Sequence, residues 1–141
     1  DYSVCTTWLV RNKRYYLLHV LRVRQDFPAL KKQIVSHAQA YGARTVLIED
    51  AGSGIGLIQE LKRDGGIHIV KITPERDKLS RLEACTAAME AGHVFIPASA
   101  SWLADYLNEL LAFPNGKYDD QVDSTSQFLT YERTRPRVHV G

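Results

Sequence analysis

Apolar residues recur with two different periods along the chain, and the change of period separates predicted strands from predicted helices. Residues 2–10 and 15–23 are rich in β-branched and aromatic side chains and flank the polar run RNKR, so we expect a β-hairpin. Residues 25–42 then follow a helical period. The residues that mark this helix are Asp26, Pro28 and Gly42 at its ends and Leu30, Ile34, Val35 and Ala38 on its apolar face.

Short apolar runs and amphipathic segments alternate through the rest of the chain. The predicted strands are TVLIED, IHIVKI and HVFIP, at residues 45–50, 67–72 and 93–97. One predicted helix follows GSG at residue 52, and the next begins near Arg76 with Leu79, Leu82, Cys85 and Met89 inward. A third predicted helix spans Trp102–Leu111. The last runs from about Asp119 to Tyr131 with Val122 and Leu129 buried. This order predicts an α/β fold with a mixed sheet flanked by helices.

Composition limits the class of protein without fixing its function. A chain of 141 residues with 45% hydrophobic residues is long enough for one globular domain with its own core. The net charge of +2 and the pI near 8.6 permit a nucleic-acid partner but do not require one. Cys5 and Cys85 are far apart, which favours free thiols in a reducing compartment. We find no membrane-span pattern or leader and expect a soluble, cytoplasmic domain.

The stretch FPNGKYDDQVDS, residues 113–124, crowds three aspartates onto the start of the last predicted helix. Residues three apart on a helix are neighbours, roughly 5–6 Å between Cβ atoms, so Asp120 and Asp123 point the same way. Asp119 lies about 100° to one side and suits an N-cap position. Clustered carboxylates raise each other's pKa unless a cation lies between them, and Mg²⁺ and Mn²⁺ prefer such hard oxygen ligands.

A second acidic pair, Glu49 and Asp50, closes the buried strand TVLIED. Functional sites in open α/β sheets lie at the carboxyl ends of strands, so an acid here can face acids on a helix. Together such acids hold two divalent ions about 3.5–4 Å apart, the arrangement used in phosphodiester hydrolysis. Glu49 and Asp50 point to opposite faces of a continuing strand, which favours only one of them as a ligand.

Four segments occur together in an order and spacing that resemble a known family: VLIEDAGSGIGLIQELK, RDKLSRLEA, AGHVFIP and FPNGKYDDQVDSTSQ. With the opening stretch DYSVCTTWLV, they look like the nuclease domain of the phage terminase large subunit, the DNA-packaging motor. The resemblance covers almost the whole chain and implies an RNase H-like fold, with residues 1–132 as the nuclease domain and 133–141 as a basic tail. It also implies cutting of double-stranded DNA with two Mg²⁺ or Mn²⁺ ions in a bacterial host.

By motif match, the resemblance assigns metal binding and catalysis to Glu49, Asp120 and Asp123, with Asp119 and Asp50 as further candidate ligands. The family has another essential aspartate on a first strand upstream of DYSV, and the sequence begins at Asp1 of this segment. We therefore expect a fold without the family's first strand and an incomplete metal site. Family partners would be an upstream ATPase domain, the terminase small subunit and the portal. The chain has no G-x-x-x-x-G-K-[ST] loop and is not expected to hydrolyse ATP.

Basic residues near the acids are the predicted DNA contacts. Lys78 and Arg81 lie three apart at the start of a helix, and Lys117 adds to the same rim, so all three can hold backbone phosphates. Taken alone, Lys78 and Arg81 suit a solvated helix face better than a phosphate contact, and the nearby acids and the family resemblance favour the DNA contact. Other chemistries fit less well, because the chain lacks a dinucleotide-binding glycine spacing, a nucleophile elbow and a zinc pattern.

The sequence thus predicts a metal-dependent DNA endonuclease domain, and two alternatives remain open. One is another RNase H-like enzyme such as a junction resolvase, which would prefer branched DNA. The other is a non-catalytic DNA-binding or motor-assembly module, whose salt-dependent DNA binding would survive replacement of Asp120 and Asp123 by asparagine.

Overall fold

The structure, a computed structural model, describes residues 2–135, which form two compact units. One unit combines the segment up to Arg24 with the segment from Asp77 onward, and the other is the continuous segment Gln25–Arg76. Most of the predicted basic tail, residues 136–141, lies outside the described residues. Within residues 2–135, every helix is too short or too polar to cross a bilayer.

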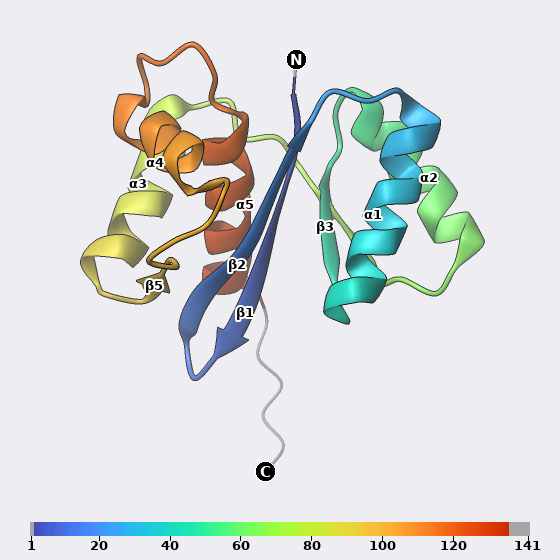
Figure 1. The fold of residues 1–141 in the computed structure, drawn as a ribbon, viewed down its shortest axis with the longest axis horizontal. Coiled ribbons are helices and arrows are strands. Elements are labelled where there is room, and N and C mark those ends of the chain that lie inside the picture. The colour runs from blue at the N-terminus through green and yellow to red at the C-terminus, as the bar shows by residue number, and fades with distance from the viewer. Residues whose placement is uncertain (1, 136–141) are drawn as a thin grey trace. The chain divides into compact units, whose positions relative to one another are not determined.

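A long β-hairpin forms the sheet of the first unit (Figure 1). Strand β1 (Ser3–Arg11) pairs antiparallel with β2 (Arg14–Val23), as predicted. The turn residues Asn12 and Lys13 have φ angles of 52° and 59°, the left-handed conformation that closes a two-residue hairpin with the correct twist. The short strand β5 (Val94–Phe95) adds to β2 in parallel, which gives a mixed sheet in the order β1-β2-β5.

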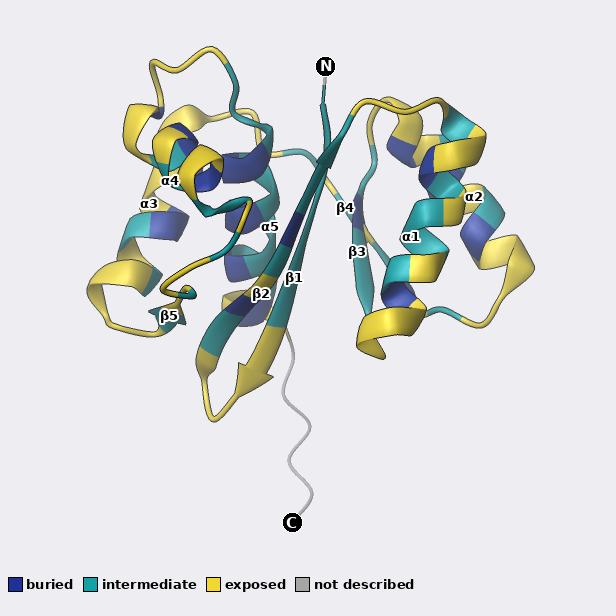
Figure 2. Ribbon diagram, in the orientation of Figure 1, coloured by how far each residue is buried: buried dark blue, intermediate teal, exposed yellow. Residues whose placement is uncertain are grey.

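Three helices complete this unit, and α5 is the one that joins its parts. Helix α5 (Asp120–Thr134) contacts α3 (Lys78–Glu90), α4 (Leu103–Ala112) and strand β1. Figure 2 shows the buried residues on the facing sides of these helices. The buried core residues are Cys85, Phe113, Val122 and Leu129 in one cluster and Leu17, Val20 and Tyr106 in another, so the predicted burial of Val122 and Leu129 is confirmed.

Helix α3 is rotated about its axis relative to the prediction. Leu79 is 60% exposed, and Leu82 and Met89 are also exposed, so the prediction that they point inward is wrong. The buried positions are Arg81, Ala84 and Cys85, which share a face at i, i+3 and i+4. Apolar residues lie on two faces of α3. The buried face is the one that carries Arg81, which forms an ion pair with Asp123 of α5.

The second unit consists of two helices and a two-stranded parallel sheet. It contains α1 (Phe27–Tyr41), β3 (Val46–Glu49), α2 (Ser53–Asp64) and β4 (Ile69–Ile72). The predicted ends of α1 are confirmed: the Asp26 Oδ1 atom accepts from the Ala29 amide at 3.1 Å, and Gly42 has a φ of 59°. Its core is formed by Leu30, Ala38, Ile48, Leu57, Ile58, Leu61 and Ile69.

The glycine-rich turn after β3 brings the start of α2 close to the end of that strand. Gly52 has a φ of 55°, which favours glycine. A Cβ atom on Gly54 would lie 2.0 Å from the carbonyl oxygen of Glu49, so no larger residue fits there without moving backbone. The turn is therefore a tight strand-to-helix connection.

Candidate metal and nucleic-acid site

The start of α5 is held in place by residues of α4. Glu109, buried in the middle of an otherwise apolar helix face, accepts hydrogen bonds from the Val122 amide at 2.8 Å and from Gln121 Nε2 at 2.9 Å. One turn further on, the hydroxyls of Tyr106 and Thr125 are hydrogen-bonded at 2.8 Å. These bonds satisfy buried polar groups at the helix start and fix its position and rotation.

Asp119, Asp120 and Asp123 converge at this helix start. Each offers a carboxylate oxygen, and these atoms lie within 4.8 Å of one another. Asp119 occupies the N-cap position, but its side chain makes no capping hydrogen bond, since Glu109 supplies that interaction from α4. The carboxylate of Asp119 is therefore available to the cluster.

Arg81 is the protein's own cation in this acidic cluster. Its side chain is a tenth exposed, and its Nη1 atom donates to Asp119 Oδ2 at 3.3 Å and to Asp123 Oδ1. The guanidinium also lies over the ring of Phe113, with Cζ 5.5 Å from the centroid. The buried Nε atom has no hydrogen-bond acceptor in residues 2–135. Arg81 thus draws two of the three carboxylates together.

The third carboxylate, Asp120, has no ion pair within the described residues. Burial raises the pKa of Asp120, and the charges of Asp119 and Glu109 raise it further. One guanidinium against three carboxylates leaves an excess of negative charge at the helix start. A half-buried group of hard oxygen donors with unbalanced charge fits a divalent cation such as Mg²⁺ or Mn²⁺.

The two other predicted acids belong to the second unit. Glu49 is the last residue of β3 and is half-buried, and Asp50 follows it. The Asp50 amide donates to the Ile72 carbonyl at 2.8 Å, and its carboxylate lies 3.8 Å from Lys71 Nζ. The structure therefore gives Asp50 a basic neighbour on the adjoining strand. It brings together the three aspartates at the start of α5, and it places Glu49 and Asp50 at the carboxyl end of β3.

The three predicted DNA contacts differ in exposure. Lys78, the first residue of α3, and Lys117, in the loop before α5, are exposed. Arg81 is buried against the aspartates instead, so its guanidinium faces the candidate metal ligands. The two lysines are thus the more accessible of the three predicted phosphate contacts.

Glu109 is a site residue that the sequence interpretation missed. It follows Tyr106 by three positions and therefore lies on the buried face of α4. An acid within an apolar stripe is the signal that could have revealed it, because a buried carboxylate needs hydrogen-bond donors. Leu111, at the end of the same predicted helix, is 84% exposed and lies outside that stripe.

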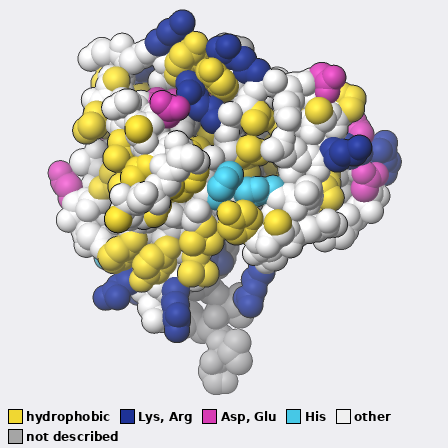
Figure 3. All heavy atoms as spheres, viewed as in Figure 1, with side chains coloured by type: hydrophobic (Ala, Val, Ile, Leu, Met, Phe, Trp, Pro, Cys, Tyr) yellow, Lys and Arg dark blue, Asp and Glu magenta, His cyan; other side chains and the backbone are white. Residues whose placement is uncertain are grey.

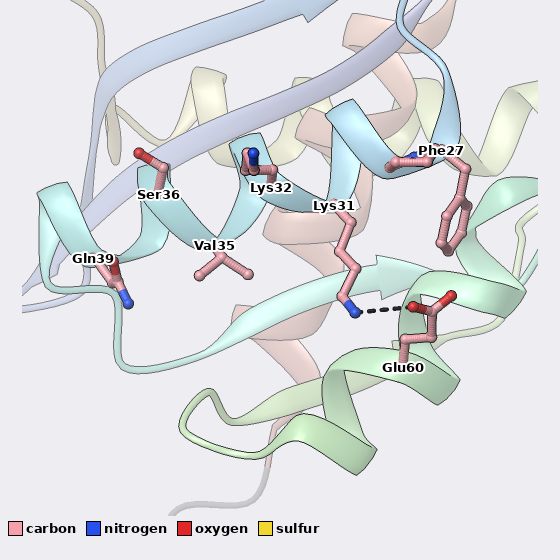
Figure 4. A pocket seen from close by; sticks show the side chains of 8 residues that line it. Phe27, Lys31, Lys32, Val35, Ser36, Gln39 and Glu60 are labelled. Carbon is pink, nitrogen blue, oxygen red and sulfur yellow. Dashed lines mark hydrogen bonds and ion pairs between the residues drawn. The ribbon is translucent and has the colours of Figure 1, made fainter.

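A hollow in the second unit contains none of the predicted site residues. It lies between α1 and α2 of the second unit, has a volume of about 660 Å³, and is lined by Phe27, Lys31, Val35 and Glu60 among others (Figure 4). Lys31 Nζ bonds to Glu60 Oε1 at 2.9 Å and to Asp64 Oδ2 at 2.8 Å. Its mainly apolar walls offer no cluster of carboxylates for a metal.

Comparison with known families decides the assignment of the fold. Residues 1–132 match the family described as the terminase RNaseH-like domain. The chain belongs to this family. The α5 aspartates therefore lie in a terminase RNase H-like domain, and the family membership expected from the four motifs is confirmed.

Solved structures agree with the family at the level of the fold. The terminase domain is similar to the zinc-bound large terminase nuclease of thermophilic phage G20c, with 20% identity, a TM-score of 0.65, and coverage of 96% of this chain and 83% of that one. It is also similar to RuvC of Thermus thermophilus, with 14% identity, a TM-score of 0.53, and coverage of 92% and 88%. No curated protein matches the sequence. The predicted α/β, RNase H-like fold class is confirmed.

Proposed function

We propose that the chain is a divalent-metal-dependent endonuclease domain that cuts double-stranded DNA during phage genome packaging. The observation that carries the proposal is the convergence of Asp119, Asp120 and Asp123 at the start of α5, in a domain of the terminase RNase H-like family. In the full protein, an ATPase domain, the terminase small subunit and the portal would be its partners. The zinc named for the phage G20c relative supports metal binding, and the carboxylate ligands favour Mg²⁺ or Mn²⁺.

Each acid has a proposed role. Asp120 and Asp123 bind the metal, Asp119 is a further ligand, and Arg81 keeps Asp119 and Asp123 close together before metal binds. Two divalent ions would activate the attacking water and stabilise the departing 3′ oxygen. Glu49 is proposed as a ligand from the motif match, since it ends a buried strand.

Exposed cations are proposed to hold the DNA backbone. Lys78 opens α3, the helix that carries Arg81, and Lys117 lies in the loop that leads into the acids. Phosphates approaching carboxylates are repelled unless cations flank the path, so lysines here would guide the backbone to the cleavage site.

Plasmid cleavage with Mn²⁺ or Mg²⁺ tests the proposal. We expect the parent, tested as the domain that includes the strand and aspartate found upstream of Asp1 in the family, to nick and linearise the plasmid. Asp123→Asn should lower the rate by at least about 100-fold, since loss of even an outer-shell metal partner costs about 10–100-fold. Glu90→Gln, an acid-to-amide change at the exposed end of α3, is the matched control and should cut at the parent rate. Equal rates for Asp123→Asn and the parent would refute the assigned metal site.

Two further measurements separate metal binding from catalysis and from the rival enzyme. Mn²⁺ should raise the thermal unfolding midpoint of the parent, by the equivalent of about 2.7 kcal/mol at 100 times the dissociation constant, and should leave that of Asp123→Asn unchanged. Glu49→Gln should lose cleavage while its unfolding in EDTA stays close to that of the parent. Faster cleavage of a four-way junction than of linear duplex would favour the resolvase alternative.

A further inference from the structure

Beside the acidic cluster, two arginines, a lysine and two tyrosines form a second group of side chains, which we call the Arg-Tyr cluster. Its members are Tyr2, Arg22, Arg24, Lys117 and Tyr118. Tyr118 directly precedes Asp119, and the charge of Arg22 acts on Asp120, so the two clusters are neighbours in one unit. Figure 3 shows Lys and Arg side chains gathered where Figure 1 has the end of β2 and the loop before α5.

The rings hold the arginines in fixed positions. Arg22 Cζ lies 3.8 Å from the Tyr2 ring centroid and 5.1 Å from that of Tyr118. Arg24 Cζ lies 4.0 Å from the Tyr2 centroid, and its Nη2 atom donates to the Tyr118 hydroxyl at 3.2 Å. The two rings meet edge to face at 5.3 Å. Stacking leaves the edge of a guanidinium, which carries its N–H donors, free to bind an acceptor.

The positive charge of this group is not neutralised within residues 2–135. Arg22, Arg24 and Lys117 form no ion pair with a carboxylate of these residues. The buried Nε atom of Arg22 has no hydrogen-bond acceptor there.

A hollow beside these cations can receive an anion. Its volume is about 240 Å³, and Arg22, Lys117 and Tyr118 lie in its wall. Glu109 also lines it, but both oxygens of that carboxylate accept hydrogen bonds from the start of α5, and the other acid in the wall, Asp105, is exposed to water. The cations thus remain the groups in need of a partner.

We propose that the Arg-Tyr cluster binds a backbone phosphate of the DNA strand, next to the phosphate that is cut at the acidic cluster. The proposal rests on the proposed nuclease function and adds Arg22, Arg24 and the tyrosines to the DNA-binding surface. A guanidinium donates two parallel hydrogen bonds to a phosphate, and one that is already stacked loses little freedom on binding. The bound phosphate fixes the register of the strand relative to Asp120 and Asp123.

Binding of a short fluorescent DNA duplex in EDTA tests this inference without metal or cleavage. Fluorescence anisotropy is measured from about 50 to about 200 mM NaCl, where each lost phosphate contact reduces the slope of log K against log salt by about 0.9. Arg22→Gln and Arg24→Gln should each weaken binding by at least about fivefold and lower the slope by about one contact. Arg22→Lys should recover part of the affinity, because it restores the charge without the planar fork.

Arg14→Gln is the matched control, because Arg14 is exposed on the same strand at the hairpin end of β2 and the change removes the same charge. Its affinity should stay within about twofold of the parent, as expected for a cation that touches no phosphate. Arg24 is exposed, so Arg24→Gln should fold even if Arg22→Gln loosens the loop before α5; Trp fluorescence confirms folding.

The outcomes separate this inference from the proposed function. Equal losses in Arg14→Gln and in the Arg22 and Arg24 variants would overturn the inference, as would failure of the parent to bind duplex in EDTA. Arg22-dependent binding by a chain that cleaves nothing with Mn²⁺ would support the phosphate site and contradict the nuclease proposal. Displacement of the duplex by millimolar inorganic phosphate alone would show a site for free phosphate and would also overturn the assignment to a DNA strand.

Discussion

Replacing Arg81 by methionine should destabilise the unit that carries the acidic cluster. Methionine keeps an unbranched, apolar stem against Phe113 but removes the charge that Asp119 and Asp123 share. The two carboxylates are then left close together without a cation. We expect a clear loss of stability in EDTA, because a charge that loses its buried partner is costly.

The exposed fractions of the three side chains set the size of this loss. Breaking a buried ion pair by removing one partner costs about 3–5 kcal/mol. Arg81 is 10% exposed, but Asp123 is 25% and Asp119 is 40% exposed, so water screens part of the remaining repulsion. We therefore expect a loss of about 2–3 kcal/mol. For a chain of this length that corresponds to a fall of roughly 6–9 °C in the thermal midpoint.

Tryptophan fluorescence in a urea titration is the appropriate assay. Trp8 and Trp102 are the only tryptophans of the sequence, and both belong to the unit that contains Arg81. The signal therefore reports unfolding of that unit alone. Lys78→Met, on the same helix but exposed, is the control and should cost less than about 0.5 kcal/mol.

A double variant checks the physical cause. Arg81→Met combined with Asp123→Asn should cost less than the sum of the single changes by about 1–2 kcal/mol, because the second change removes part of the repulsion. If Arg81→Met costs no more than Lys78→Met, the ion pair does not hold the cluster and the reasoning is refuted.

Three further results are expected. Gly54→Ala should destabilise its unit by about 1–3 kcal/mol or more in a far-UV circular dichroism melt, because its methyl group would meet the Glu49 carbonyl. The raised pKa of Asp120 means that the folded state favours the neutral carboxyl, so the stability that this neutral group contributes is lost as pH rises through that pKa. Asp120→Asn should therefore be more stable than the parent at neutral pH and should lose this advantage in acid. Urea titration at several pH values measures the difference. Burial, and secondarily the charge of Asp123, raises the pKa of Cys85 to about 11, so alkylation at mildly alkaline pH followed by mass spectrometry should be at least about 100-fold slower than in urea.

Each of these has its own control or contrary outcome. Ser53→Ala, at the exposed position directly before the buried Gly54, should leave the melt unchanged, and a similar effect of both changes would refute the close contact. A stability difference between Asp120→Asn and the parent that grows in acid would reverse the stated sign. Rapid alkylation of Cys85 in the folded protein would show that this side chain is not buried in solution.

Local signals made the hairpin and α1 predictable. The polar turn between two β-branched runs, and the Asp26 and Gly42 ends of α1, depend only on neighbouring residues, and the structure confirms them. The clustering of Asp120 with Asp123 was equally predictable, because helical spacing alone brings them together. These features needed no information from distant parts of the chain.

Long-range ion pairs and hydrogen bonds made the rest unpredictable. Arg81 and Asp123 are 42 positions apart, and nothing in their local sequence says that they pair. That pairing accompanies the rotation of α3, which exposes Leu79 and buries Ala84. The capping of α5 by Glu109 likewise depends on how α4 packs, which periodicity does not specify.

The residues of α5 that are hydrogen-bonded to Glu109 and Tyr106 differ from the residues proposed to bind metal. These hydrogen bonds hold Gln121, Val122 and Thr125, none of which is a proposed ligand. The backbone of α5 therefore keeps its place when the aspartates are changed. An inactive variant with changed aspartates would therefore serve as a substrate trap that captures DNA in its binding position for crystallography. A lineage that lost cleavage would be able to keep the same fold as a DNA-holding module.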